Sequence, residues 1–138
     1  MENKVGTIIL LLLFSLVGYA QDLTSTAEYD VVKSAFTLKI KNCSAKRLIV
    51  YGGWGTVENY AIKSCIYNSL DKCLTEEYYS LSDTISSIII EPNETFCRRL
   101  NILNWLDGAK IGFIVEYKYV FEYGEWQKFR KEYQYNLK

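Results

Sequence analysis

The stretch from Lys110 to Leu137 restricts the fold of this chain most, because it contains two consecutive strand patterns. In its first half, apolar and aromatic side chains recur at every second residue, which is typical of a strand with one buried face. The expected core side of this strand carries Ile111, Phe113, Val115, Tyr117, Tyr119 and Phe121. After a turn at 123–125, the second strand carries Phe129, Tyr133, Tyr135 and Leu137 on one side. The pattern predicts a β-hairpin, which needs further strands to cover its apolar face.

The preceding chain offers those strands. We expect strands over residues 35–41, 47–51, 59–67, 84–90 and 95–102, a possible edge strand over 28–33, and a polar loop over 68–79. In the strand from Ala35, the side chains of Phe36, Leu38 and Ile40 should face inward. No segment shows a helical period. Seven or eight short antiparallel strands are most simply arranged as an all-β sandwich of two sheets, since each strand needs one face covered.

The N-terminus has the features of a secretory signal peptide. The segment from Val5 to Ala20 is uncharged, follows Lys4, and ends with small residues at Gly18 and Ala20. A membrane anchor is the alternative, but this apolar run is shorter than the roughly 20 residues that a span needs. We therefore expect cleavage after Ala20, a lead and edge strand over 21–34, and one domain over 35–138. The product would be secreted or periplasmic, with no later membrane span.

The charge and motif content argue against several classes of function. Sixteen basic residues balance sixteen acidic ones, so the basic surface that nucleic-acid binding requires is not expected. The chain has no histidine, the usual general base and metal ligand, and we find no catalytic motif and expect no cofactor. A small hydrolase with paired carboxylates is the least favoured alternative. Its candidate carboxylates would be Glu76, Glu77, Asp83 and Asp107.

The four cysteines, Cys43, Cys65, Cys73 and Cys97, all follow the predicted cleavage site. An even number in an exported chain predicts two disulfides, with three possible pairings. Zinc is not expected, because no Cys-x-x-Cys spacing and no histidine occurs.

Three segments carry a resemblance to known proteins. The strand Phe36 to Asn42 with its polar turn, and the segment Ile88 to Phe96 before the last hairpin, resemble immunoglobulin-like sandwiches of small secreted bacterial proteins. In such domains the chain changes sheets at a corner like Glu91 to Phe96. The end of the signal, Gly18 to Gln21, is similar to those of exported Bacteroidetes proteins. A fainter likeness is to the bacterial intracellular proteinase inhibitor family.

The immunoglobulin-like order implies a disulfide pairing. If the strands that end at Cys43 and begin near Cys97 are antiparallel neighbours, these two cysteines would be joined. Cys65 would then pair with Cys73.

Two tripeptides, Asn42-Cys43-Ser44 and Asn93-Glu94-Thr95, fit the N-glycosylation pattern. We expect neither to be glycosylated, because the signal looks bacterial.

The high aromatic content, 15% of the residues, points to binding rather than catalysis. Exposed aromatic rings stack on sugars or fill pockets on a protein partner. The candidate binding residues are Tyr51, Trp54, Tyr78 and Tyr79, in or beside the irregular segment 52–79. We expect Trp105 and Trp126 to be mostly buried at the ends of the sandwich. The sequence thus predicts a non-catalytic module that binds a protein partner, such as an inhibitor or immunity-type protein, with carbohydrate as the alternative ligand.

Overall fold

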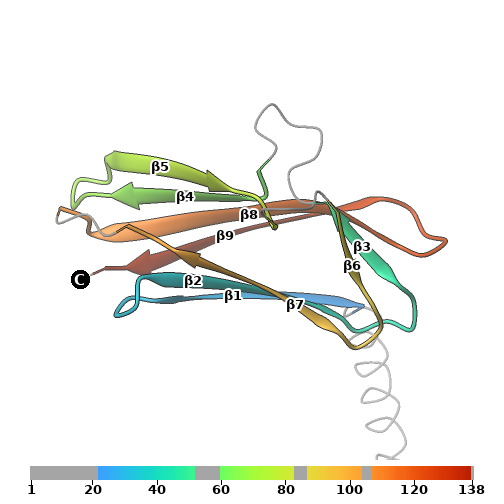
Figure 1. The fold of residues 1–138 in the computed structure, drawn as a ribbon. Helices are drawn as coiled ribbons and strands as arrows, with labels where there is room; N and C mark the ends of the chain where they lie inside the picture. The colour runs from blue at the N-terminus through green and yellow to red at the C-terminus, as the bar shows by residue number, and fades with distance from the viewer. Residues whose placement is uncertain (1–21, 52–59, 83–86, 104–106, 138) are drawn as a thin grey trace, which may run out of the picture.

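The computed structural model describes residues 22–51, 60–82, 87–103 and 107–137. These residues contain nine strands arranged in two antiparallel sheets that lie against each other (Figure 1). The predicted all-β, two-sheet architecture is confirmed. The predicted signal peptide over 1–20 lies outside the described residues. Within the described ranges, no helix is long and apolar enough to cross a membrane.

The first sheet contains three strands in the order β1-β2-β7, namely β1 (Leu23–Asp30), β2 (Ala35–Asn42) and β7 (Thr95–Asn101). The central strand buries Phe36, Leu38 and Ile40 completely, as its alternation predicts. The edge strand begins at Leu23 and not at Glu28, and it pairs with β2 over eight positions. Sequence reasoning missed its first half because small polar side chains conceal the alternation there.

The second sheet is built around β8 (Lys110–Phe121), the longest strand. One edge of β8 pairs with β9 (Gln127–Asn136). The other edge is shared by two strands placed end to end. β4 (Ile62–Tyr67) pairs with the first half of β8, and β3 (Leu48–Tyr51) pairs with its last four residues. β5 (Cys73–Tyr79) lies beyond β4, and β6 (Ser87–Ile90) lies beyond β3 (Figure 1).

The core fills the space between the facing sides of the two sheets. Phe36 of the first sheet stacks on Phe113 of the second, with ring centroids 3.9 Å apart. Further along β8, Tyr117 stacks on Phe129 of β9 at 4.9 Å. The expected core face of the β8–β9 hairpin therefore does face inward, which leaves the alternate side chains of β8 on the outer surface.

The chain passes from the second sheet to the first at the turn between β6 and β7, and Asn42 organises this corner. Its side-chain amide donates to the carbonyl oxygens of Lys46 at 2.7 Å and Ile90 at 2.9 Å. Its side-chain oxygen accepts hydrogen bonds from the backbone N–H and the hydroxyl of Ser44. Asn42 is completely buried. Because both amide protons are used, Asn42 cannot carry a glycan in the folded protein.

The structure confirms one predicted disulfide and contradicts the other. Cys65 is bonded to Cys73, and the bond ties β4 to the start of β5. Cys43 and Cys97 are free and exposed. Their strands are antiparallel neighbours, as expected, but the register places Lys39 opposite Cys97. Cys43 lies four residues further along, about 13 Å at the rise of a strand, which is too far for a disulfide.

Candidate binding surface

The outer face of the second sheet carries a continuous group of apolar side chains. Ile49 of β3 lies between Ile89 of β6 and Val120 of β8 in the register of the sheet. On the far side of β8, Gln127 lies opposite Tyr119, which brings Trp126 to the level of Val120. These outward side chains form a row that crosses β6, β3 and β8 and ends at Trp126, directly before β9. Together with Tyr51 they are called the apolar strip below, and its members are Ile49, Tyr51, Ile89, Val120 and Trp126.

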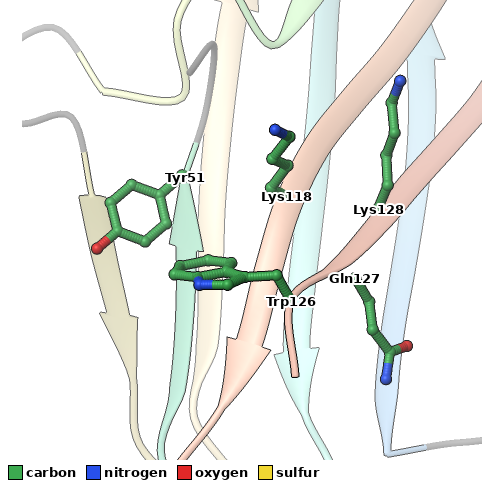
Figure 2. A pocket seen from close by; sticks show the side chains of 5 residues that line it. All are labelled: Tyr51, Lys118, Trp126, Gln127 and Lys128. Carbon is green, nitrogen blue, oxygen red and sulfur yellow. The ribbon is translucent and has the colours of Figure 1, made fainter. Parts of the chain in front are cut away.

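Trp126 and Ile89 are the most exposed members of the apolar strip. Trp126 is 55% exposed and Ile89 is 56% exposed. The Trp126 indole contacts the Tyr51 ring with centroids 4.7 Å apart and an interplanar angle of 61°. Because Tyr51 belongs to β3 and Trp126 precedes β9, the indole extends across the outer side of β8. Both rings line an open hollow of about 600 Å³ together with the side chains of Lys118, Gln127 and Lys128 (Figure 2).

The two long borders of the apolar strip carry different charges. On one side lie Lys118, which has no ion-pair partner within the described part of the chain, and Lys128, whose amine is 2.6 Å from Glu116. On the other side lie Glu122 and the exposed ion pair between Arg47 and Glu91, 2.9 Å apart. The strip therefore separates a border with an available ammonium group from a border with a net negative charge.

The structure separates the four residues that the sequence singled out for binding. Trp54 lies outside the described residues. Tyr51 belongs to the apolar strip. Tyr78 and Tyr79 lie on β5, so the polar loop predicted over 68–79 is confirmed for 68–72 and wrong for 73–79. Because successive side chains of a strand point to opposite faces, these two tyrosines cannot act together on one ligand.

Tyr78 is on the outer face, and Tyr79 is on the inner side. Tyr78 is 38% exposed and packs against Tyr60 with ring centroids 5.3 Å apart. The ammonium group of Lys63 lies 5.7 Å from the Tyr78 ring. Tyr79 packs against the core and donates a hydrogen bond to Glu77. Burial, together with this carboxylate, raises the pKa of Tyr79 to about 12. Tyr79 is therefore a structural residue.

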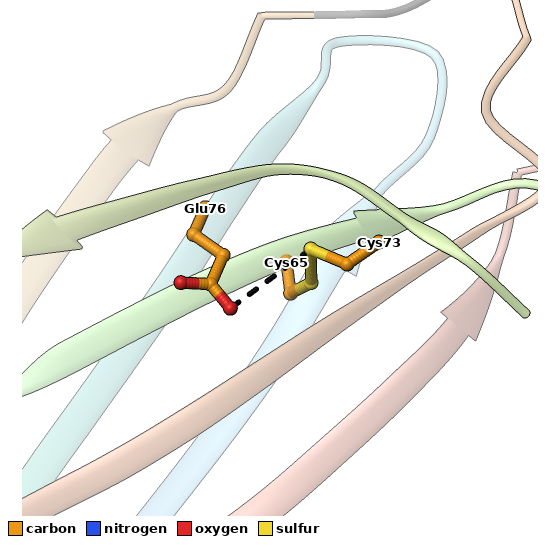
Figure 3. Close-up of side chains that lie close together, drawn as sticks. All are labelled: Cys65, Cys73 and Glu76. Atoms are coloured by element: carbon orange, nitrogen blue, oxygen red, sulfur yellow. Dashed lines mark hydrogen bonds between the residues drawn. A yellow bond between two sulfur atoms is a disulfide. The ribbon is translucent and has the colours of Figure 1, made fainter.

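The Cys65–Cys73 disulfide and Glu76 form the one cluster of potential metal ligands in the described ranges, with donor atoms within 4.8 Å of one another (Figure 3). Zinc binds cysteine as a thiolate, and sulfurs joined in a disulfide are not thiolates. The nearest distance from Cys73 Sγ to a Glu76 oxygen is 4.0 Å. Glu76 also pairs with Lys63 at 3.4 Å and accepts a hydrogen bond from Tyr78. The arrangement fits a structural disulfide beside a surface ion pair.

The carboxylates proposed for a hydrolase are not brought together where the structure describes them. Glu76 and Glu77 are neighbours on β5 and face opposite sides of the sheet. Asp107 is exposed in the segment before β8, and Asp83 lies outside the described residues.

Sequence reasoning missed Trp126 as a candidate binding residue, because it expected a buried ring at the end of the sandwich. The residues next to Trp126 in the sequence indicate an exposed position. Trp126 stands between Glu125 and Gln127 in a polar hairpin connection, which is a position typical of an exposed side chain. Only the cross-strand register shows that its ring meets Tyr51, which is 75 positions earlier in the chain.

No family model and no curated protein matches this chain. The solved structures that are similar to it include two proteins from structural genomics. One is a crystal structure of a Bordetella pertussis protein provisionally named ApaA, with a TM-score of 0.53 and 17% identity over 82% of this chain and 91% of that one. The other is an X-ray structure of a structural genomics target, with a TM-score of 0.51 and 15% identity over 83% of this chain and 85% of that one. At these identities the likeness concerns the fold alone.

Proposed function

We propose that this chain is an exported, non-catalytic module that binds a protein partner through the apolar strip on the outer face of its second sheet. The observation that carries the proposal is the exposure of Trp126 and Ile89 at the two ends of an apolar row whose middle members, Ile49 and Val120, are half-buried. Tryptophan and tyrosine are enriched among the residues that dominate protein interfaces, and they act best in a desolvated centre with a polar rim. The strip has this composition, with lysines and glutamates along its borders. The signal-like residues 1–20 support export.

The aliphatic members of the strip favour protein over carbohydrate. A sugar-binding face uses aromatic rings for stacking and polar groups for hydrogen bonds, and has little use for Ile49, Ile89 and Val120. A protein partner, in contrast, gains free energy by covering them. Carbohydrate stays the second candidate, because the hollow beside Trp126 combines an aromatic wall with Lys118 and Lys128.

A pull-down with matched variants tests the proposal. The oxidised domain and its Trp126→Ala and Ile89→Ser variants are used as baits against the native envelope fraction and culture fluid. Val32→Ser is the control, because Val32 is 94% exposed in the β1–β2 turn, far from the strip. We expect one protein to be retained by the wild type and by the control, and lost from both strip variants.

Other outcomes would count against protein binding through the strip. Equal retention by all four baits would place the binding site elsewhere on the molecule. Retention of no protein, with binding on a glycan array that Trp126→Ala abolishes, would replace the proposal with carbohydrate binding.

A further inference from the structure

The borders of the apolar strip indicate which kind of protein segment it accepts. We infer that the strip binds a short amphipathic helix with an acidic flank beside Lys118 and a basic flank beside Glu91 and Glu122. This inference rests on the proposed function and adds the shape and charge of the partner. It follows from three properties of the strip, namely its width, its length and the charge of its two borders.

The width of the strip fits a helix better than an extended segment. On β8, the outward positions Lys118 and Glu122 lie on either side of Val120, and four residues of strand span about 13 Å. A helix with its side chains is about 10–12 Å across, so it fills this width and reaches both borders. An extended segment projects alternate side chains up and down, and so it cannot contact both borders with the same face.

The length of the strip sets the length of the helix. The strip crosses β6, β3 and β8 and ends directly before β9, and three spacings between neighbouring strands amount to about 14 Å. At about 1.5 Å per residue, this corresponds to between two and three helical turns. One large apolar side chain of the helix would enter the hollow lined by Trp126 and Tyr51, as anchors do in helix-in-groove complexes.

The charges of the borders select the flanks of the helix. Lys118 offers an ammonium group with no ion-pair partner in the described ranges, and the neighbouring Lys128 is half exposed despite its contact with Glu116. Across the strip, Glu91 and Glu122 outnumber Arg47. A helix with carboxylates on one flank and amines on the other is complementary to both borders in one of its two directions. A helix with the same charge on both flanks meets repulsion at one border in either direction.

Three labelled helical peptides test the inference. They share one leucine stripe and differ only in their flanks, which carry glutamate and lysine, glutamate on both sides, or lysine on both sides. Fluorescence anisotropy measures their affinity for the folded, oxidised domain. We expect the mixed peptide to bind about fivefold more tightly than either of the others, the size of effect of one surface charge pair. Ile89→Ser should weaken binding of all three peptides, and Val32→Ser should not.

Charge reversal makes the test specific. With Lys118→Glu, both borders become acidic, and the peptide with lysine on both flanks should become the tightest binder. Lys33→Glu, which reverses an exposed charge in the β1–β2 turn, should leave the order unchanged. Equal affinities for the three peptides, or an order that Lys118→Glu does not change, overturn the inference about charge.

If no peptide binds while the strip variants still lose the native partner in the pull-down, the helical partner is wrong and the proposed function stands. If Ile89→Ser still binds the peptides and still retains the native partner, the inference and the proposed function are both overturned.

Discussion

Asn42 shows how much a single polar residue contributes to this fold. It is completely buried at the corner of the two sheets, and its side chain makes four hydrogen bonds. Asn42→Ala removes all four and leaves the carbonyl oxygen of Ile90 without its side-chain donor. A buried polar group that loses its partner costs about 1–3 kcal/mol. We expect Asn42→Ala to lower the free energy of unfolding by about 3 kcal/mol in urea denaturation.

Ser44→Ala is the matched control for Asn42→Ala. It removes the hydroxyl that donates to Asn42 or Lys46 and accepts from the Lys46 backbone N–H, and it leaves the other three hydrogen bonds of the Asn42 side chain in place, so we expect a loss of about 1 kcal/mol. If Asn42→Ala destabilised the protein no more than Ser44→Ala does, the corner would not depend on the asparagine. The sequence marked Asn42 only as part of a glycosylation pattern. Its structural role depends on Lys46 in the β2–β3 turn and on Ile90 of β6, which the fold brings to it from the second sheet.

At the scale of elements, the β4–β5 hairpin depends on its disulfide. β5 is an edge strand, and Cys65–Cys73 joins it to β4 across a separation of eight residues. A loop this short predicts a stabilisation of about 2.5 kcal/mol from the restricted unfolded chain. The double variant Cys65→Ala, Cys73→Ala should lose roughly this amount of unfolding free energy. The double variant Cys43→Ala, Cys97→Ala should change it by less than about 0.5 kcal/mol, because both thiols are exposed and free.

Labelling with a thiol reagent checks the same assignment. In the folded, unreduced protein, Cys43 and Cys97 should be modified and Cys65 and Cys73 protected. Modification of Cys65 or Cys73, or equal stability of both double variants, would contradict the disulfide.

Element prediction from sequence succeeded where alternation was strong and failed where it was weak. β8 and β9 follow from their aromatic side chains, and β2 from three buried ones. β5 contains Thr75, Glu76 and Glu77, which suggest a loop, yet it forms a strand because β4 and the disulfide supply its partner. As an edge strand it has little apolar surface to bury, so its sequence carries little strand signal.

At the scale of the whole molecule, the buried tyrosines make the stability of the fold depend on pH in the alkaline range. Burial raises the pKa of Tyr29, Tyr79, Tyr117, Tyr133 and Tyr135. For Tyr79 the pKa rises from its ordinary value of 10.0 to about 12. A raised tyrosine pKa favours the neutral, protonated form in the folded state. The stability that the protonated Tyr79 contributes to the folded state is complete below pH 10. It is lost as the pH rises from 10 towards 12, because the unfolded chain releases the proton first.

Thermal unfolding across this pH range measures the effect. We expect the melting temperature to fall steeply above pH 10, with a smaller fall in Tyr79→Phe, which has one fewer proton to lose. A spectrophotometric titration should show part of the tyrosines ionising only as the protein unfolds. Ionisation of all tyrosines near pH 10 without unfolding would contradict the raised pKa values.

The sequence by itself determined the all-β class, the final hairpin and the inward faces of most strands, because a period of two is a local property that a single strand already displays. It also placed Tyr51 at the end of a clear strand, whereas the Cys65–Cys73 pairing came from the immunoglobulin-like resemblance and not from the residues alone. Only the tertiary structure decided the rest. The separation of Cys43 from Cys97, the role of Asn42 and the meeting of Tyr51 with Trp126 depend on the register between strands that are far apart in sequence. Register is set by how all the strands pack together, and a shift of a few residues would change each of these contacts.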